Sequence, residues 1–363
     1  MSLNNKKILI SGYYGFNNFG DDAILHVIIE DIKKNIPEAD ITVLSATPQR
    51  TEAVYGVKAV NRFDLKKVFS AIKYTDVFVS GGGSLLQDIT SFKSLVYYLG
   101  LIFTAKMLTK KVFIYAQGIG PIDSKIGRVL THFVLKRADV VTVRDNDSKN
   151  FLDYLDVNAD VTADPVWKAL NPDSFDFEKF GIKQDKIKVG VQLRNWKTLD
   201  DKATELLAKA VNKTFGDMSY QIVLLSLQDS QDLAVSKLFE SKLKVLNPVI
   251  DTKIVSNLSV LDGLAVISQM DFMAAVRFHA ALCAMKFNIP TFCISYDPKV
   301  STLAEEAGAP WASINKLNLE EIEAKLEDLS INKSLHEERL RLFSNKKQQL
   351  ANKNVDFLMN MLK

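Results

Sequence analysis

The sequence predicts an α/β protein made of two Rossmann-like, doubly wound parallel sheets that face a cleft. Short apolar runs, such as Lys7–Ser11 and Phe272–Val276, alternate with longer helical patterns along most of the chain, as in parallel sheets covered by helices. The chain has 363 residues, more than one domain usually holds. The alternation fails once, around Asn171, Pro172 and Gly181, where the composition indicates a linker. Two α/β domains around one linker predict a cleft between their strand ends.

The N-terminal domain is assigned to residues 1–168. Its strands are expected at the apolar runs 7–11, 40–44, 76–80, 111–116 and 139–143. Helices are expected between them, at residues 21–35, 65–73, 91–109 and 124–137. Asp21 or Asp22 can cap the first helix, because a carboxylate at that position accepts hydrogen bonds from the N–H groups of the first turn. For both residues this structural role is the alternative to a functional one.

The C-terminal domain is assigned to residues 182–345, after a linker at 169–181. Strands are expected at residues 186–193, 220–226, 272–276 and 291–295. Helices are expected at residues 200–215, 230–242, 260–269, 280–286, 300–307 and 319–328. A charged helical pattern then runs from Ser334 to Lys363, and its last part, residues 346–363, is assigned as a separate C-terminal helix.

The composition is that of a globular protein without nucleic-acid-binding character. Lys and Arg number 46 against 43 acidic residues, a balance that does not indicate nucleic acid as a partner. Cys283 and Cys293 lie in apolar context and are expected to be buried thiols of a cytoplasmic protein. The N-terminus runs directly into a strand, so no secretory signal is expected. The longest apolar stretch, Leu95–Leu108, contains Lys106 and is shorter than a spanning helix requires.

Polar residues follow several strands of the N-terminal domain. Gly81-Gly82-Gly83 follows one strand and leads to Gln87 and Asp88. Glycines leave backbone N–H groups accessible, so this segment is a candidate cradle for an anion or a sugar. Gln117 and Arg144 end two further strands. The alternative is ordinary turn chemistry, since parallel sheets need glycines at their corners.

The C-terminal domain places four potential cations just beyond strands, namely Arg194, Arg277, His279 and Lys299. Such a set suits a small, multiply charged anion, and a helix start adds N–H groups directed at the same anion. No acidic cluster or zinc-ligand spacing accompanies these residues, so no metal is expected. The alternative is that Arg277 pairs with an acidic neighbour and that His279 is a half-buried structural histidine. The residues alone favour a transferase with an anionic donor on one domain and a hydroxylic acceptor on the other.

Segments along nearly the whole chain resemble the polysaccharide pyruvyl transferase family. They are Gly12-Tyr-Tyr-Gly-Phe-Asn-Asn-Phe-Gly-Asp-Asp-Ala23, Gly81-Gly-Gly-Ser-Leu-Leu-Gln-Asp88, Tyr115-Ala-Gln-Gly-Ile-Gly-Pro121, Val143-Arg-Asp145, Ala163-Asp-Pro165, Arg277-Phe-His279 and Ser295-Tyr-Asp-Pro-Lys299. The pattern looks most similar to the bacterial branch that modifies secondary cell wall polymers, which anchor S-layer proteins.

The resemblance implies a GT-B-like pair of domains and a reaction without a cofactor. The family transfers the enolpyruvyl unit of phosphoenolpyruvate onto two hydroxyls of one sugar, which forms a cyclic ketal and releases phosphate. In the cell wall branch the acceptor is N-acetylmannosamine of a lipid-linked disaccharide, modified at O4 and O6. The family's donor-binding residues fall on Arg194, Arg277, His279 and Lys299, and Arg144 is carried over as well.

On this basis we expect Arg277 and Lys299 to clamp the donor, and His279 to contact the leaving phosphate or to supply a proton. Asp22, Asp88 and Asp164 are candidate bases, with none preferred. On the acceptor side, the expected substrate-binding residues are Arg144, Asp22, Gly82, Gly83, Gln87, Asp88, Gln117 and Asp164.

Two other functions stay open at this stage. One is a GT-B glycosyltransferase that uses a sugar nucleotide, and the other is a non-catalytic glycan-binding protein. A lipid-linked acceptor implies peripheral contact with the inner face of a membrane. The stretch Leu99–Lys111 is a candidate for that contact, because it ends in apolar and basic residues. Its alternative, which we favour, is a core helix. The sequence makes no prediction of oligomeric state.

Overall fold

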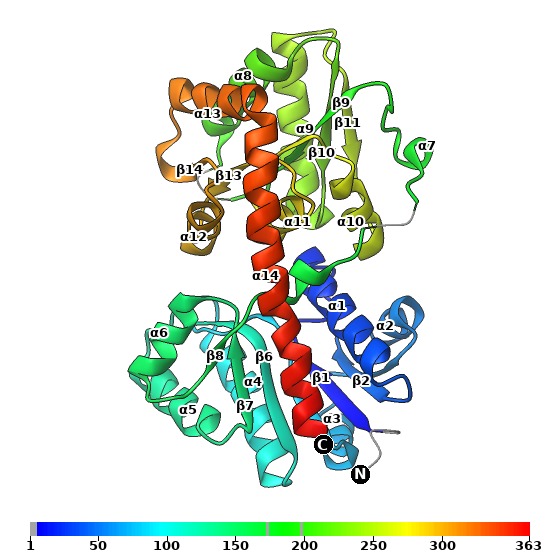
Figure 1. The fold of residues 1–363 in the computed structure, drawn as a ribbon, viewed down its shortest axis with the longest axis vertical. Coiled ribbons are helices and arrows are strands. Elements are labelled where there is room, and N and C mark those ends of the chain that lie inside the picture. Colours follow the sequence, from blue (N-terminus) through cyan, green and yellow to red (C-terminus); the bar gives the residue numbers. More distant parts are fainter. Residues whose placement is uncertain (1–5, 172–173, 197–198) are drawn as a thin grey trace. The chain divides into compact units, whose positions relative to one another are not determined.

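The computed structural model describes residues 6–171, 174–196 and 199–363. The chain divides into two compact units: unit 1 comprises Met1–Lys168 and Lys347–Lys363, and unit 2 comprises Ala169–Lys346. Each unit is built around one parallel sheet with helices on its faces (Figure 1). The expected linker at 169–181 is therefore part of unit 2, and the expected C-terminal helix is grouped with unit 1.

The sheet of unit 1 has the order β3-β2-β1-β4-β6-β7-β8, and β5 pairs with β6 beside β4. All of these pairs are parallel. The central strands are apolar and buried on both faces, as parallel strands between helices must be. The strands are β1 (Lys7–Ser11), β2 (Asp40–Ser45), β3 (Lys58–Asn61), β4 (Val77–Ser80), β5 (Gly83–Leu86), β6 (Lys111–Ile119), β7 (Val140–Val143) and β8 (Asp160–Val161).

Right-handed crossovers place α3 to α6 on one face of this sheet and α1 and α2 on the other. The end of α14 packs on unit 1 as well, where the Asn354 side chain donates to the carbonyl of Ala163 and accepts from the hydroxyls of Thr142 and Thr162. The helices are α1 (Phe19–Asn35), α2 (Pro48–Tyr55), α3 (Leu65–Tyr74), α4 (Phe92–Met107), α5 (Lys125–Leu135), α6 (Asn146–Tyr154) and η1 (Pro165–Lys168), and α14 runs from Lys333 to Leu362.

The sheet of unit 2 has the order β11-β10-β9-β12-β13-β14 and is parallel throughout. Its strands are β9 (Ile187–Gln192), β10 (Tyr220–Leu225), β11 (Thr252–Val255), β12 (Phe272–Ala275), β13 (Thr291–Ser295) and β14 (Trp311–Ser313). Its helices are α7 (Phe177–Phe180), α8 (Asp201–Phe215), α9 (Asp229–Leu246), α10 (Val260–Ser268), α11 (Phe278–Lys286), α12 (Pro298–Ala307), η2 (Ile314–Lys316) and α13 (Leu319–Ile331).

The expected cap of the first helix is wrong. Helix α1 begins at Phe19, and Asn18 is its cap, with a side-chain oxygen that accepts from the N–H of Gly20 at 3.2 Å. Asp21 and Asp22 lie inside the first turn. The reason is the backbone: Asn17 has a φ of 56° and Asn18 is extended, so the helix starts earlier than the apolar periodicity indicates.

The structure also describes the two cysteines, the C-terminal helix and the apolarity of the helices. Cys283 and Cys293 are buried, and burial raises the pKa of the Cys293 thiol to about 12. Helix α14 is continuous from Lys333, so residues 346–363 are the end of a longer helix and not a separate element. No helix within the described residues combines the length and the apolarity that crossing a bilayer requires.

Candidate functional site

The carboxyl ends of three neighbouring strands of unit 2, β9, β12 and β13, carry the candidate donor-binding residues. In the register of the sheet, Gln192 of β9 is level with Ala275 of β12, and Ala275 is level with Cys293 of β13. Arg194 lies two residues after the end of β9, and Arg277 lies two residues after the end of β12. Because β9 and β12 are neighbours, both residues lie at the same edge of the sheet. Ligands of open parallel sheets bind at this edge.

Arg277 is held by a buried carboxylate. Its Nε and Nη2 atoms donate to Asp232 of α9, with Nη2 to Oδ1 at 2.6 Å and Nε to Oδ2 at 2.9 Å. Nη2 also donates to the Gln228 side chain at 3.0 Å, and the Gln192 side chain accepts from the Arg277 backbone N–H at 2.8 Å. The sequence alternative of an acidic partner is therefore correct for one side of the guanidinium. Nη1 has no hydrogen-bond partner among the described residues.

Asp232 is the residue of this network that the sequence did not reveal. It is fully buried, and it accepts further hydrogen bonds from the backbone N–H groups of Leu227 and Gln228 and from the Gln192 side chain. Burial raises its pKa, while Arg277 and the two backbone donors act in the opposite direction. Asp232 precedes Arg277 by 45 residues in the chain. No local pattern connects the two, and the pairing arises only because β10 and α9 pack beside β9 and β12.

Arg194 reaches across the end of β12. Its Nη1 donates to the hydroxyl of Tyr296 at 3.0 Å, and its guanidinium lies over the rings of Tyr296 and Trp196 at 5.5 and 5.4 Å. Arg194 follows β9 and Tyr296 follows β13, and these strands flank β12. The contact therefore spans the carboxyl end of the strand that carries Arg277. Its Nε atom is buried without a hydrogen-bond partner among the described residues.

His279 and Lys299 stand in the first turns of two helices that begin at this edge. His279 belongs to α11, and its ring packs edge-on against Phe278 at 5.1 Å. The N-cap of α11 is Arg277, which makes no side-chain capping bond. Lys299 belongs to α12 and forms an ion pair with Asp297 at 3.2 Å, with a side chain one-third exposed. Asp297 also caps α12 by accepting from the Lys299 N–H.

This edge is suited to an anion. Arg277 is preorganised by its buried partner, Lys299 is accessible, and a helix N-terminus without a side-chain cap lies between them in the chain. A carboxylate or phosphate that met Nη1 of Arg277 would gain a charge-assisted hydrogen bond at little cost in side-chain ordering. Within the described residues, no group of three or more His, Cys, Asp or Glu side chains gathers closely enough to hold a metal ion.

In unit 1, Arg144 is buried at the carboxyl end of β7. Its Nη1 pairs with Asp164 at 3.3 Å, its Nε with Asp145 at 3.4 Å, and its Nη2 donates to Ser84 at 3.0 Å. The guanidinium lies directly over Gly118, where a Cβ atom would come within 2.8 Å of it. Gly118 is therefore needed to make room for Arg144.

The glycine triplet 81–83 is buried and filled by neighbouring side chains. A Cβ atom at Gly81 would lie 2.2 Å from the hydroxyl of Tyr14, and one at Gly82 would lie 3.0 Å from Ile24. Gly83 has a φ of 95° and begins β5. The Gly81 N–H already donates to the carbonyl of Ser11 at 2.7 Å. These contacts favour a packing role over the expected open cradle.

Three more expected acceptor-side residues make local structural bonds. The Gln117 amide donates to the Ser80 hydroxyl at 2.7 Å and to the Gly81 carbonyl at 2.9 Å, which ties β6 to the end of β4. The Gln87 side chain accepts from the Thr90 N–H. Asp88 accepts from the N–H groups of residues 123 and 124; desolvation would raise its pKa, but these bonds outweigh it, so the pKa is lowered.

Asp22 differs from the other two candidate bases. Asp88 is occupied by backbone donors and Asp164 by Arg144, whereas no hydrogen bond among the described residues involves the Asp22 carboxylate. Burial raises its pKa to about 6, and the charge of Arg50 opposes this only in part. A carboxylate that titrates near neutral pH is a suitable general base. The structure therefore favours Asp22 among the three.

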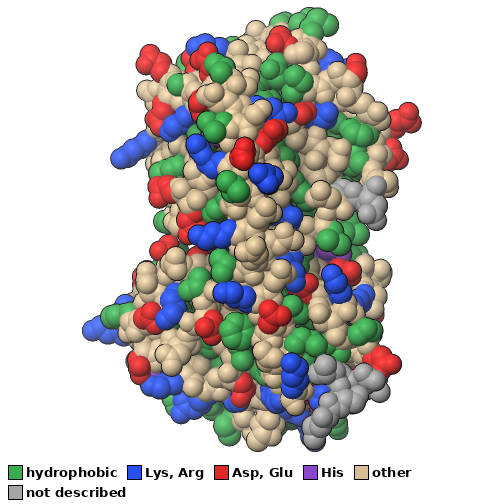
Figure 2. Space-filling view, viewed as in Figure 1, with side chains coloured by type: hydrophobic (Ala, Val, Ile, Leu, Met, Phe, Trp, Pro, Cys, Tyr) green, Lys and Arg blue, Asp and Glu red, His purple; other side chains and the backbone are tan. Residues whose placement is uncertain are grey.

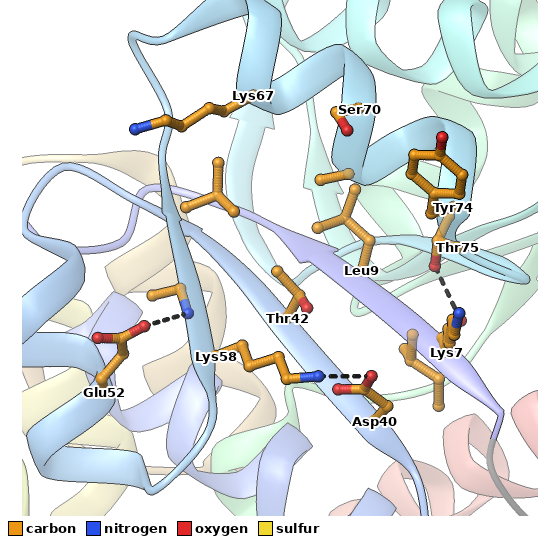
Figure 3. Close-up of a pocket in the computed structure, with 14 residues that line it drawn as sticks. Lys7, Leu9, Asp40, Thr42, Glu52, Lys58, Lys67, Ser70, Tyr74 and Thr75 are labelled. Carbon is orange, nitrogen blue, oxygen red and sulfur yellow. Dashed lines mark hydrogen bonds and ion pairs between the residues drawn. The ribbon is translucent and has the colours of Figure 1, made fainter.

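A cavity of about 500 Å³ lies elsewhere in unit 1, between α3 and strands β1 to β3 (Figure 3). It is lined by Lys7, Asp40 and Lys58 at the amino ends of these strands, and Asp40 and Lys58 pair with each other at 2.7 Å. This is the opposite edge of the sheet from the residues described above. The cavity holds none of the candidate catalytic residues.

Comparison with known proteins identifies a family and a fold. The model of the family described as polysaccharide pyruvyl transferase matches residues 18–298. No curated protein matches the sequence. Among solved structures, UDP-GlcNAc 2-epimerase from Neisseria meningitidis, bound to UDP-GlcNAc, is similar with a TM-score of 0.64 at 12% identity, covering 98% of this chain and 99% of that one.

Two further solved structures are similar over nearly the whole chain. UDP-GlcNAc 2-epimerase from Methanocaldococcus jannaschii has a TM-score of 0.62 at 14% identity, covering 91% of this chain and 99% of that one. A glycosyltransferase from Rickettsia africae has a TM-score of 0.60 at 13% identity, covering 99% and 96%. At these identities the likeness shows the fold alone, and that fold is the GT-B-like α/β class predicted from the sequence.

Proposed function

The chain belongs to the polysaccharide pyruvyl transferase family, and we propose that it transfers the enolpyruvyl unit of phosphoenolpyruvate to two hydroxyls of one sugar. The product is a cyclic pyruvate ketal, and inorganic phosphate is released. The observation that carries this proposal is the set of cations at the carboxyl edge of the unit 2 sheet, where Arg277 is fixed by Asp232 and Lys299 is accessible. Phosphoenolpyruvate carries a carboxylate and a phosphate within three carbons, and both need cations.

The proposed reaction has two steps, in which the protons and the electron pairs balance. A proton is added to C3 of phosphoenolpyruvate, and a sugar hydroxyl attacks the cationic C2 and loses its own proton. The bond from C2 to the phosphate oxygen then breaks, and the phosphate leaves with the electron pair. The second hydroxyl attacks C2 and gives up its proton, which closes the ring. Of the two hydroxyl protons, one is balanced by the new C3–H bond and one by the released phosphate.

The residues take distinct roles in this proposal. Nη1 of Arg277 and Nζ of Lys299 bind the donor's anionic groups. Arg194, which follows β9, adds a third cation at the same edge of the sheet, where it donates to the Tyr296 hydroxyl. His279 contacts the leaving phosphate or supplies the proton for C3, because an imidazole can donate hydrogen bonds and protons. Asp22 is the preferred base for an acceptor hydroxyl, because burial raises its pKa to about 6 and no hydrogen bond among the described residues occupies its carboxylate.

The proposed acceptor is N-acetylmannosamine in a lipid-linked cell wall glycan of the kind that anchors S-layer proteins, ketalised at O4 and O6. The sequence resemblance to the secondary cell wall branch supports this choice. Its test is incubation with phosphoenolpyruvate and an N-acetylmannosaminyl glycan. Mass spectrometry should detect the ketal, and one phosphate should be released for each ketal formed.

Variants at the donor edge assign the roles. His279→Ala and Lys299→Met should each abolish or strongly reduce ketal formation. Lys237→Met is the matched control, because Lys237 is an exposed lysine of α9 in the same unit. Full activity of His279→Ala would refute the role given to that histidine. Absence of phosphate release with every glycan acceptor would refute the proposed reaction.

Ligand-induced stabilisation separates this function from a sugar-nucleotide transferase. A ligand present at one hundred times its Kd stabilises the folded protein by about 2.7 kcal/mol. Phosphoenolpyruvate should therefore raise the melting temperature by several degrees, while UDP-sugars should leave it unchanged. The reverse pattern would favour a GT-B glycosyltransferase. Binding of glycan without any phosphate release from phosphoenolpyruvate would favour a non-catalytic glycan-binding protein.

A further inference from the structure

Helices α3, α4 and α5 of unit 1 contain no acidic residue. Their sequences are LKKVFSAIKY, FKSLVYYLGLIFTAKM and KIGRVLTHFVL. The whole chain is nearly balanced, with 46 basic and 43 acidic residues, so a surface built from these helices departs from the rest. The basic residues that they carry are Lys66, Lys67, Lys73, Lys93, Lys106, Lys125 and Arg128.

These helices also expose apolar side chains in their first two turns. Leu65 and Phe69 are exposed on α3, Phe92 and Val96 on α4, and Ile126 and Val129 on α5, with exposed fractions from 40% to 70%. The spacing of four or three residues places each pair on one helix face. We call these six residues the apolar band.

The apolar band borders one edge of the sheet. Each of the three helices follows a strand, so its first turns lie at the carboxyl edge. Right-handed crossovers put the helices on the same face, α3 beside α4 and α4 beside α5. The band therefore runs next to the edge where unit 1 carries Arg144 and where α1 carries Asp22.

Asp64, Asp88 and Asp123 lie just before the three helices, but most of the basic residues on the helices have no ion-pair partner among the described residues. Lys67 pairs with Asp64, which caps α3, and Lys106 pairs with Asp139. Lys66 has no ion-pair partner among the described residues, and the same holds for Lys73, Lys93, Lys125 and Arg128. The face that Figure 2 shows over α1 and α14 differs, because positive and negative side chains are interspersed there.

We propose that the apolar band and its flanking basic residues dock unit 1 on an anionic lipid bilayer. Exposed apolar side chains flanked by Lys and Arg are the pattern of interfacial helices, in which the apolar groups enter the headgroup region and the cations meet anionic lipid. A second copy of the chain fits poorly, because a two-fold contact would set these cations against themselves with little acid to neutralise them. The charge of the surface therefore selects a negatively charged partner.

The docking surface differs from residues 99–111, which the sequence offered as a candidate for membrane contact. For that stretch the favoured alternative, a core helix, is confirmed, because Leu99, Leu101, Ile102 and Ala105 are buried in the core of unit 1. The two exposed residues of α4 that belong to the apolar band, Phe92 and Val96, lie at the start of the helix. The inference rests on the proposed function in one respect: a lipid-linked acceptor would reach the carboxyl edge directly from a bilayer held against the apolar band.

Vesicle co-sedimentation tests the proposal with the full chain. The protein should bind vesicles of phosphatidylglycerol and phosphatidylcholine, bind pure phosphatidylcholine weakly, and lose binding as salt is raised. The triple variant Phe69→Ser, Phe92→Ser, Ile126→Ser should weaken binding to the anionic vesicles at least about tenfold. The matched control is Met218→Ser, Val245→Ser, Val249→Ser, three exposed apolar residues of unit 2, and it should bind as the unmodified chain does.

Activity measurements keep this inference separate from the proposed reaction. With a water-soluble glycan, both triple variants should form ketal at the unmodified rate, and with a lipid-linked glycan in vesicles only the apolar-band variant should be slowed. Equal melting temperatures establish that both variants fold. The proposal is overturned if the unmodified chain does not bind anionic vesicles, or if the two triple variants bind them equally. It is also overturned if light scattering shows a dimer that only the apolar-band variant loses, since the surface then belongs to a second copy.

Discussion

Replacing Asp232 with asparagine tests whether a buried carboxylate holds Arg277 ready for an anion. Asparagine keeps the size of the side chain and removes its charge. Both Nε and Nη2 of Arg277 would then face a partner with one acceptor oxygen instead of two. The guanidinium is about nine-tenths buried, so it cannot recover its lost partner from water.

The expected loss of stability is large because the charge is left inside the protein. Removing one partner of a buried ion pair costs about 3–5 kcal/mol. Asp297→Asn is the matched control. Asp297 pairs with Lys299, the other cation proposed to bind the donor, but both side chains are about one-third exposed. Exposed pairs contribute about 0–1 kcal/mol, and asparagine still caps α12. The two variants should differ by about 3 kcal/mol in the free energy of unfolding.

Urea unfolding and steady-state kinetics measure the two consequences. Asp232→Asn should lower the melting temperature by about 10 °C and raise KM for phosphoenolpyruvate at least about tenfold, as expected for a weakened charge-assisted hydrogen bond. A role in folding alone would lower stability and leave KM unchanged in the fraction that stays folded. The reasoning fails if Asp232→Asn is no less stable than Asp297→Asn, or if KM is the same in both.

Two further predictions concern unit 1. Burial raises the pKa of Asp22 to about 6, above the value of about 3.9 in the unfolded chain. The ionised carboxylate therefore destabilises the fold fully above about pH 6, and this destabilisation disappears as the pH falls towards 4. Asp22→Asn should therefore be more stable than the unmodified chain at pH 7, by up to about 3 kcal/mol, and no more stable at pH 4. Thermal unfolding of both proteins at pH 7 and pH 4 tests this prediction. If Asp22 is the base, kcat/KM of the unmodified chain should also rise with pH through about 6, and this limb should be absent in the variant. Gly118→Ala should displace the Arg144 guanidinium and reduce ketal formation, whereas Gly100→Ala, which meets no atom within 4 Å, should leave activity intact; equal activities would remove Arg144 from the site.

The fold was predictable where the apolar pattern is strong. Strands β1 and β13 match their apolar runs residue for residue, because both are buried central strands. Strands β3 and β14 were missed, since they are three or four residues long, lie at sheet edges and are only partly buried. Local pattern is weak in such strands, and pairing with a neighbour decides their conformation.

Local residue type was less informative wherever a distant side chain decides the outcome. The glycine at 81 looks like the start of a ligand cradle, yet the Tyr14 ring folds back over it and over Gly12 and fills the space. Tyr14 is fully buried, and burial raises the pKa of its hydroxyl well above the usual value. Nothing in the spacing of the glycines distinguishes a ligand from a tyrosine, because either needs the same absence of a Cβ atom.

Arg277 shows why the two interpretations of a buried arginine at a strand end, anion binding and pairing with an acidic neighbour, need not exclude each other. The guanidinium has donors on two sides, and the structure assigns one side to Asp232 and Gln228. A lone arginine would arrange five donors in many ways and would lose side-chain entropy on binding an anion. With Nε and Nη2 fixed, that entropy has been lost already in folding, and Nη1 would meet an anion in one orientation. The acidic partner, which in the sequence is the alternative to a binding role, would therefore make the proposed binding of an anion by Arg277 more efficient.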